Sequence, residues 1–503
     1  MVNKNRYMLR IFLIMSYVLV ISVITFLISS LFTYINTGAE RSKILHLEVK
    51  KEVQYLPELT WASNGNEGRF MNNQVLNTIQ NDYLDAWYVK NIAFRTNEIN
   101  GIEDFYTESA RVNLYKNINN NIKENIFIEG TTFKHNPDII FFSEDGQLVV
   151  LEDKNVVEYK KIYQNNKLVY KTTERNSYKV ILLLEDGFWR IRHIIKQASE
   201  DFKPQLNSVS FNFIMKGINY YPKNNPWDMF GDDFKIRTIK KDFKIITKAG
   251  LNTIRIFIPY EDFGKASVKQ SKLDKLKKVL DAAEKSNLKV VVTLFDFYGN
   301  YDILDWTLNQ RHLETIVKTF KEHEAILAWD LKNEPNLDFD QRGKETVISW
   351  LRQMLILVKS IDNKHAVTIG WSNTESAHIL SKELDFVSFH YYEDKANFEY
   401  DYNVLKNQIP NKQLVLGEFG ISSYNGMWKP FIGSKEKQAN YHKEMQKVLN
   451  KNKISFLSWT LYDFEEVPSD VVGNLPWRVN PQKEFGFIDI KGKKKPAFKY
   501  ISK

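Results

Sequence analysis

Eight short apolar segments, most of them separated by an amphipathic helical segment, limit the possible folds of this chain more than any other feature. Strands that alternate with helices are typical of βα units, which build a parallel sheet. Eight such units in about 300 residues have the size of a closed (β/α)8 barrel, the TIM barrel. The predicted strands span residues 214–219, 253–258, 290–295, 326–331, 366–370, 386–389, 414–418 and 454–459. The predicted helices between them include residues 236–249, 273–285, 313–323, 347–361 and 435–449.

The length of the chain requires more than one folded unit. At 503 residues it exceeds the roughly 250 to 300 residues at which a single hydrophobic core stops growing. We assign residues 205–503 to the barrel and expect a smaller domain at residues 68–197. The short polar segment between the two domains would connect them.

The N-terminal segment predicts a transmembrane helix. Residues 11–35 contain no charged side chain, and about 20 apolar residues suffice for a helix to cross the apolar part of a bilayer. Positive residues near a span stay on the cytoplasmic side, so residues 1–10 would form a cytoplasmic tail. Residues 36–67 would form a membrane-proximal stalk, and the rest of the chain would be extracytoplasmic. The basic residues that set this orientation are Lys4, Arg6 and Arg10.

A cleaved signal peptide is the alternative interpretation of this N-terminal segment. The apolar stretch of a signal peptide is usually only about 7 to 15 residues long, and it ends at a site with small residues. The tripeptide Thr37-Gly38-Ala39 resembles such a site only poorly. We therefore favour an uncleaved anchor.

The middle region predicts an α+β domain. Apolar residues recur at helical spacing over residues 70–91, and a second helical segment covers residues 102–118. Strand-like runs joined by turn dipeptides such as Asp145-Gly146 and Asp186-Gly187 follow them. This order of elements, and a last hairpin with Trp189 just after its turn, resembles nuclear-transport-factor-2-like domains. We assign no chemistry to this domain. The predicted strands are 139–142, 148–151, 156–163, 168–173, 178–184 and 188–195.

Composition excludes several classes of partner and site. The net charge of +9 is spread along the chain without a block of five or six like charges, so we expect no nucleic-acid partner. The absence of cysteine excludes disulfides, thiolate metal sites and a cysteine nucleophile. None of the nine histidines forms an HExxH motif. We expect neither a metal nor a cofactor.

Polar residues at the ends of the predicted barrel strands are the candidates for chemistry, because active sites of TIM barrels lie at that face. Two carboxylates stand out among them: Glu334 after the fourth strand and Glu418 in the seventh. These two strands face each other across the barrel. Glycoside cleavage needs a carboxyl group on each side of the scissile bond, and a separation of about 5 to 5.5 Å gives retention of configuration. The other strand-end candidates are Asn219, Tyr220, Arg255, Asp296, Asn333, Trp371, Asn373, His390, Tyr392, Trp459 and Asp463.

These residues also resemble a known family. The motif Asn333-Glu334-Pro335, the second glutamate in Gly417-Glu418-Phe419-Gly420 and four further strand-end residues look like the clan-A glycoside hydrolases. The opening segment Met215–Tyr221 is most similar to glycoside hydrolase family 5, the cellulase and mannanase family. The resemblance covers residues 210–502. The four further residues are Arg255, His390, Tyr392 and Trp459.

The resemblance implies a role for each of these positions. Glu334 would be the acid/base and Glu418 the nucleophile, with Asn333 bound to the sugar 2-hydroxyl. Arg255 would keep the nucleophile ionised, because a nearby cation lowers the pKa of a carboxyl group. The remaining three would complete the site: His390 and Tyr392 by positioning the carboxylates, and Trp459 as a floor for the sugar ring.

One departure from the family pattern bears on the substrate. Family 5 members commonly have a histidine after the third strand, where this chain has Asp296. Asn219 and Trp371 are further expected supporting residues. Each residue taken singly also has a structural interpretation: a glutamate at a strand end can form an ion pair, and an aromatic residue can belong to the core.

The function that we expect from the sequence is hydrolysis of a β-linked polysaccharide of the β-glucan or β-mannan type by a membrane-anchored, extracytoplasmic glycosidase. Two alternatives stay open. A transglycosylase would use the same two glutamates, and a non-catalytic glycan-binding or scaffold protein would rely on the domain at residues 68–197. That domain could also self-associate or contact the machinery of exopolysaccharide synthesis.

Overall fold

The computed structural model describes residues 2–35, 54–62, 67–204, 206–426 and 433–502. It falls into two compact units, residues 1–53 and residues 54–503. In the first unit, α1 (Val2–Ile35) includes both the predicted tail and the predicted span. In the part of the chain that the structure describes, no helix reaches the length and hydropathy needed to cross a membrane. The predicted transmembrane helix is therefore not supported.

The segment predicted as a stalk lies partly outside the described residues. Its described part is not a stalk, because two short strands in it pair with the sheet of the following domain: β1 (Glu58–Leu59) with β3 (Ile126–His135), and β2 (Glu67–Gly68) with β4 (Pro137–Phe142). Tyr55, just before β1, is buried in the core of that domain. These strands are two residues long, too short for a periodicity to show in the sequence.

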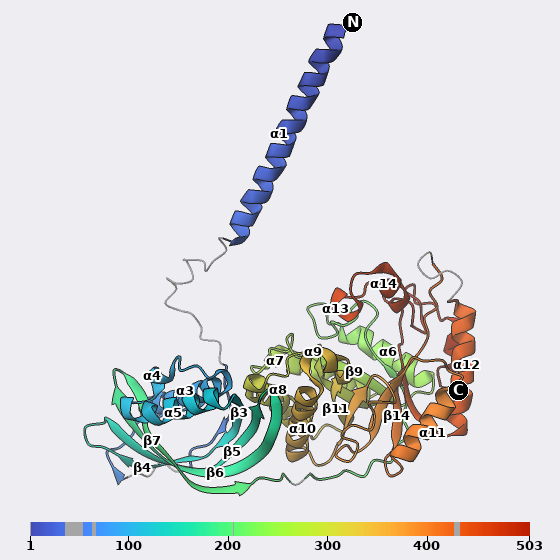
Figure 1. Ribbon diagram of the computed structural model, residues 1–503. Coiled ribbons are helices and arrows are strands. Elements are labelled where there is room, and N and C mark those ends of the chain that lie inside the picture. The colour runs from blue at the N-terminus through green and yellow to red at the C-terminus, as the bar shows by residue number, and fades with distance from the viewer. Residues whose placement is uncertain (1, 36–53, 63–66, 205, 427–432, 503) are drawn as a thin grey trace. The chain divides into compact units, whose positions relative to one another are not determined.

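The middle domain has three helices followed by long antiparallel strands, the α+β order that the sequence predicts. Figure 1 shows the helices on the concave side of a curved sheet. Its strands follow the order β1-β3-β5-β4-β2, with β6 paired to β5 and β7 to β6. The similarity to nuclear-transport-factor-2-like domains stays a prediction. The remaining elements are α3 (Asn73–Thr96), α4 (Ile102–Phe105), α5 (Glu108–Lys123), β5 (Leu148–Gln164), β6 (Lys167–Glu185) and β7 (Phe188–Asp201).

Two features of this sheet differ from the prediction. The strand β3 was not predicted, because Gly130 and two threonines interrupt its apolar pattern. The sequence predicts two strands over residues 148–163 and two over residues 168–184, whereas β5 and β6 are each continuous. Their pairing shifts register between Asp153 and Val156. An irregularity of this kind bends a strand and breaks the alternation of side chains without ending the ladder.

The second part of this unit is a closed barrel of eight parallel strands, which confirms the predicted TIM fold. The strand order is β10-β11-β12-β13-β14-β15-β8-β9. All eight predicted strands are present within three residues at either end. They are β8 (Lys216–Asn219), β9 (Thr253–Pro259), β10 (Lys289–Asp296), β11 (Ile326–Asn333), β12 (Ala366–Trp371), β13 (Val387–Tyr391), β14 (Leu414–Phe419) and β15 (Ser455–Ser458).

The helices around the barrel also match the predicted ones, with an additional helix, α11 (Phe398–Gln408), between the sixth and seventh strands. In the described chain between β12 and β13, turns stand in place of a helix. Short helices follow the third, fourth and eighth strands: η1 (Ile303–Asp305), η2 (Pro335–Asp338), α9 (Phe339–Arg342), α13 (Ser469–Val472) and α14 (Pro476–Gln482). The surrounding helices are α6 (Ile236–Lys248), α7 (Gln270–Glu284), α8 (Trp306–Phe320), α10 (Lys344–Ile361) and α12 (Lys435–Lys451), with η3 (Pro496–Tyr500) near the end.

The middle domain and the barrel share packed side chains. Phe133 and Tyr159 of the middle sheet lie 6.3 and 5.0 Å, between ring centroids, from Trp306 at the start of α8. Both belong to the same hydrophobic cluster as the barrel core. Arg95 at the end of α3 donates two hydrogen bonds of 2.7 Å to the carboxylate of Asp302. Apolar packing together with a two-point ion pair fixes this junction.

Candidate active site

The two predicted carboxylates face the same cleft. Glu334 follows the last residue of β11, and Glu418 lies within β14. One oxygen of each carboxyl group and one ring nitrogen of His390 all lie within 4.8 Å of one another. Glu334 has the left-handed backbone angle φ of 48° and donates its N–H to the carbonyl of Gly370 at 2.7 Å. Residues in this uncommon conformation concentrate at functional sites.

Arg255, at the third position of β9, is the centre of the hydrogen-bond network below the cleft. It is 2% exposed, and its Nη1 donates to Glu418 Oε1 at 2.6 Å and to Asn219 Oδ1 at 3.2 Å. Its Nη2 donates to Asn333 Oδ1 at 2.8 Å. The guanidinium group therefore links the first, second, fourth and seventh strands in one network. Asn219 lies beneath the cleft and supports Arg255.

Asp330 is the partner of Arg255 that the sequence analysis missed. Its Oδ2 accepts hydrogen bonds from Arg255 Nε at 2.9 Å and Nη2 at 2.5 Å, and a third from Thr293 at 2.8 Å. Its Oδ1 accepts the N–H of Gly370 at 3.0 Å. The sequence does contain a signal for this partner. Asp330 is a lone carboxylate inside an apolar strand, and a buried carboxylate needs a charged or hydrogen-bonding partner.

The two glutamates have different hydrogen-bond donors. Glu418 accepts from Arg255 and, at 3.0 Å, from the hydroxyl of Tyr392. Glu334 accepts at 2.7 Å from Nδ1 of His390. Burial acts to raise the pKa of both carboxyl groups, and the neighbouring donors oppose it: Arg255 and Tyr392 at Glu418, and His390 at Glu334.

Because the two carboxyl groups interact across the cleft, they titrate together, and the question is which of them holds the proton when only one is bound. A negative charge is better stabilised on Glu418, which has a full cation and a hydroxyl as donors. We therefore place the proton of the pair on Glu334.

The cleft above the two glutamates has a volume of about 590 Å³ and an aromatic wall. Trp459 lies at its base, 6.4 Å between ring centroids from both Tyr221 and Phe257. Asp296 and Lys332 also line the cleft. Burial raises the pKa of Asp296 to about 6 and lowers the pKa of Lys332. The cleft thus offers apolar ring faces beside a few charged groups, the combination that sugar rings require.

The structure does not bring every predicted site residue to this cleft. Trp371 is completely buried, lies 6.4 Å between ring centroids from Phe339 of α9, and is not among the residues that line the cleft. The carboxylate of Asp463 is bound by Lys495 at 2.7 Å. Lining residues that the sequence analysis missed come from segments that only folding brings to the cleft: Tyr221, Phe257, Phe297, Lys332, Leu337, Asp338, Val471, Val472, Gln482 and Phe485.

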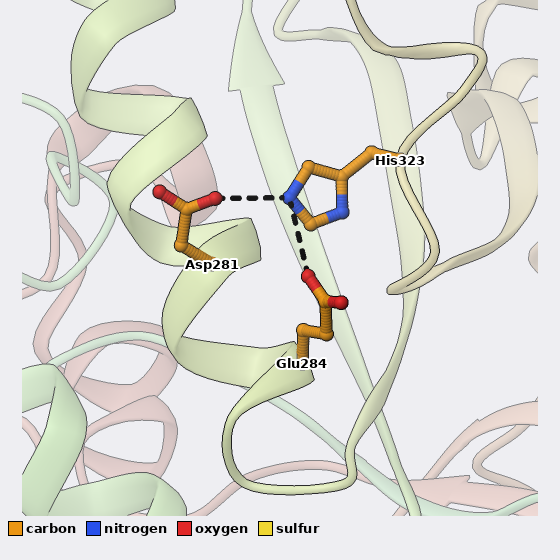
Figure 2. A group of neighbouring side chains, drawn as sticks. All are labelled: Asp281, Glu284 and His323. Atoms are coloured by element: carbon orange, nitrogen blue, oxygen red, sulfur yellow. Dashed lines mark hydrogen bonds and ion pairs between the residues drawn. The ribbon is translucent and has the colours of Figure 1, made fainter.

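A second group of titratable side chains lies on the outer side of the barrel, where Asp281 and Glu284 of α7 face His323 (Figure 2). Nε2 of His323 is 3.2 Å from Asp281 and 3.9 Å from Glu284. Nδ1 of the same ring accepts the N–H of Ala325 at 3.2 Å, which places the ring proton on Nε2. A ligating Nε2 would need this proton on Nδ1, so the geometry favours a surface hydrogen bond from Nε2 to Asp281 over a metal site.

Comparisons with known proteins agree with this site. The model of the cellulase family, glycosyl hydrolase family 5, matches residues 207–465. Mannan endo-1,4-beta-mannosidase 3 of Solanum lycopersicum is 27% identical over 187 residues, which cover 28% of this chain and 45% of the relative. Mannan endo-1,4-beta-mannosidase 5 of the same plant is 30% identical over 176 residues, covering 25% and 40%. The aligned segments thus span less than half of the length of these two relatives.

Solved structures of similar proteins include an exo-beta-1,4-mannosidase from an Opitutaceae bacterium, with 17% identity, a TM-score of 0.47 and coverage of 58% of both chains. A Bacteroides uniformis beta-glucuronidase has 14% identity and a TM-score of 0.47, covering 75% of this chain and 49% of the other. The family match extends over just over half of the chain and includes both Glu334 and Glu418. The chain therefore belongs to the cellulase family, glycoside hydrolase family 5 of clan A.

Proposed function

We propose that the chain hydrolyses a β-linked polysaccharide of the β-mannan or β-glucan type by double displacement, with retention of configuration. The observation that carries this proposal is the spacing of the two carboxylates. Oxygens of Glu334 and Glu418 lie within 4.8 Å of each other, close to the separation of about 5 to 5.5 Å in retaining enzymes and below the 6.5 to 9.5 Å of inverting ones. An inverting enzyme needs the wider separation so that a water molecule fits between the sugar ring and the base, and this spacing leaves no room for that water.

In the first step, Glu418 attacks the anomeric carbon while Glu334 donates its proton to the departing glycosidic oxygen. The product is a covalent glycosyl ester of Glu418 and a free sugar chain. In the second step, the Glu334 carboxylate takes a proton from water, whose oxygen attacks the same carbon and releases Glu418. The bond to Nδ1 of His390 holds Glu334 in one orientation through both steps.

The amide of Asn333 is positioned for the sugar. Asn333 lines the cleft, and its Oδ1 is occupied by Arg255 at 2.8 Å. Its NH2 group is then the part that can donate to a sugar hydroxyl. A hydrogen bond to the 2-hydroxyl strengthens in the transition state, where charge develops at the neighbouring anomeric carbon.

Internal cleavage of a polymer is supported by the length of the binding surface. Tyr392 lines the catalytic cleft and also a second depression of about 420 Å³, which continues past His390 to Tyr400 and Val404 of α11. Tyr400 is largely exposed. A binding surface that continues from the two glutamates past Tyr392 to α11 can hold several sugar units of one chain. The two tomato relatives are named for endo-action on 1,4-beta-mannan, which makes mannan the first substrate to test.

The proposal is tested by release of reducing ends from a panel of β-mannans, β-glucans and xylans, with a soluble form that starts at residue 40. Activity on one polymer that disappears in Glu418→Ala is the expected result. Activity that persists in that variant would contradict the assignment of the nucleophile. Longer products from short oligosaccharides at high acceptor concentration would instead identify a transglycosylase.

Retention is tested separately with azide. In Glu418→Ala, azide should occupy the space of the nucleophile and give a glycosyl azide of inverted configuration. In Glu334→Ala, azide should attack the glycosyl ester and give the azide with the configuration of the substrate. Proton NMR of the products distinguishes the two anomers, and the same anomer from both variants would contradict double displacement.

Attachment to a membrane, with the catalytic domain outside, is also part of the proposal. Its support is the uncharged run at residues 11–35 with basic residues before it. The full chain should then remain in membranes washed with alkaline carbonate, and an external protease should digest its barrel in intact cells. A full chain that carbonate releases from the membrane would contradict the anchor and leave the proposed reaction untouched.

A further inference from the structure

A polar pocket of about 320 Å³ lies where the middle domain meets the barrel; we call it the junction pocket. Its volume falls at the lower end of the range of small-ligand sites, roughly 300 to 1,000 Å³. Both domains contribute side chains to it, so neither could form it alone. Its lining residues from the middle domain are Arg95, Glu129 and Lys161, and those from the barrel include Asn300, Tyr301, Asp302, Gln341, Arg342 and Thr346.

Lys161 is the feature of this pocket that needs an explanation. Its side chain is 1% exposed and lines the pocket, yet among the residues that the structure describes its ammonium group has no hydrogen-bond or ion-pair partner. Glu129, its neighbour across the β3–β5 ladder, and Glu345 attract this ammonium group only from beyond ion-pair distance. A buried charge without a partner is costly, on the order of several kcal/mol. A bound anion would remove this cost.

The other charged groups of the junction pocket leave it cationic. Arg95 and Asp302 neutralise each other through their paired hydrogen bonds. Glu129 accepts a hydrogen bond of 3.3 Å from the hydroxyl of Tyr163. Arg342, exposed at the rim, adds a second cation to Lys161. Two cations against one carboxylate favour an anionic ligand.

The junction pocket adjoins the catalytic cleft. Tyr301 lines the pocket, and its hydroxyl donates a hydrogen bond to Asp338, which lines the cleft beside Lys332. The packing of Phe133 and Tyr159 on Trp306 fixes the two domains at this point. The pocket and the cleft are thus neighbours joined through the Tyr301–Asp338 hydrogen bond, and the packed interface sets the position of the pocket relative to the cleft.

We propose that the junction pocket binds the carboxylate of an acidic sugar in the glycan that is cleaved between Glu334 and Glu418. This inference rests on the proposed function, and it gives the middle domain a part in substrate recognition. Lys161 contacts the carboxylate, Arg342 attracts it at the rim, and the side-chain amides of Asn300 and Gln341 bind sugar hydroxyls. The substrate is accordingly a β-linked polysaccharide with uronic acid units.

The test compares two ligands that differ only in charge. β-1,4-linked tetramannuronate and β-1,4-mannotetraose have the same backbone, with a carboxylate in one where the other has a hydroxymethyl group. Binding of each is measured by calorimetry, at low and high salt, with the chain from residue 40 onward. Glu418→Ala is present throughout, with the wild-type pocket and with each pocket variant, so that neither ligand is cleaved. We expect the acidic ligand to bind at least tenfold more tightly at low salt and to lose this advantage at high salt, because salt screens the interaction.

Variants assign the preference to the pocket. Lys161→Gln should remove the tenfold preference for the acidic ligand and leave the affinity for mannotetraose unchanged, while Lys161→Arg should retain it. Lys179→Gln, which removes an exposed lysine of the same sheet, is the matched control and should behave as wild type. Since Lys161→Gln removes an unpaired buried charge, its thermal unfolding midpoint should not fall, so a loss of binding is not a loss of folding.

Three results would overturn the inference. The first is equal binding of the two tetrasaccharides by wild type, and the second is a preference that survives in Lys161→Gln. The third is inorganic sulfate bound as tightly as tetramannuronate, which would identify a site for small anions rather than for a glycan. Because binding is measured without turnover, these outcomes do not depend on activity. Failure of the proposed function would appear separately, as absence of any polymer cleavage that depends on Glu418.

Discussion

Replacement of Arg255 by methionine tests how the site keeps its nucleophile charged. Methionine retains an apolar side chain of similar length and removes the cation that lies 2.6 Å from Glu418. The cation lowers the pKa of Glu418 relative to a site without it, whereas burial raises this pKa. Without Arg255, burial is opposed chiefly by the neighbouring His390 and Tyr392, and Glu418 binds its proton up to a higher pH. A protonated Glu418 cannot attack the sugar.

The size of the effect follows from the contact. A neighbouring arginine lowers the pKa of a carboxyl group by about 1 to 3 units, so the acid limb of the kcat/KM profile should move up by about 1 to 3 pH units in Arg255→Met. On the acid side, kcat/KM should fall about tenfold for each unit. Loss of one partner of a buried ion pair costs about 3 to 5 kcal/mol. With an unfolding entropy of about 2.1 cal/mol/K per residue over about 450 residues, the unfolding midpoint should fall by only about 3 to 5 °C.

The assay is initial-rate hydrolysis of the polymer identified in the substrate panel, between pH 4 and 9, with thermal unfolding as a check on folding. Arg352→Met, which removes a surface arginine paired with Glu383 at 3.3 Å, is the control and should leave the acid limb in place. An acid limb that does not move in a folded Arg255→Met would refute the argument, because it would mean that the charge on Glu418 does not depend on this cation.

Further predictions concern the acid, the floor and the wall of the cleft. Glu334→Gln should lose activity on polymer by about 10³-fold but keep activity on aryl glycosides with good leaving groups, which need no proton; comparable losses on both substrates would contradict its role as acid. Trp459→Ala should raise KM about tenfold with a smaller change in kcat, as measured on oligosaccharides, since a stacked ring contributes about 1 kcal/mol beyond burial. The pKa of Asp296 is raised from 3.8 to about 6, so the folded state holds this proton more tightly than the unfolded state does. The protein should therefore lose about 2 kcal/mol of folding stability as the pH rises from 4 to 6. Asp296→Asn should therefore gain stability relative to wild type over that interval in denaturant titrations, and a constant difference would count against the shift.

The sequence by itself determined the barrel and the positions of its chemistry. Short apolar runs followed by amphipathic helices have periods that can be read locally, so all eight strands were predicted. In a closed barrel, the place of a strand in the chain order also determines its position around the barrel. The glutamates after the fourth strand and in the seventh could therefore be assigned to one cleft before their distance was known.

Only the tertiary structure decided which groups surround these two glutamates. The pairing of Asp330 with Arg255 joins strands 75 residues apart, and the burial of Trp371 depends on which way the end of β12 turns its side chain. The junction pocket needs Lys161 of the middle sheet and Arg342 of the barrel at the same place. Periodicity describes a single segment, whereas contacts between distant segments depend on how whole elements pack. For that reason the reaction class follows from the sequence, and the charge that we propose for the substrate follows from the fold.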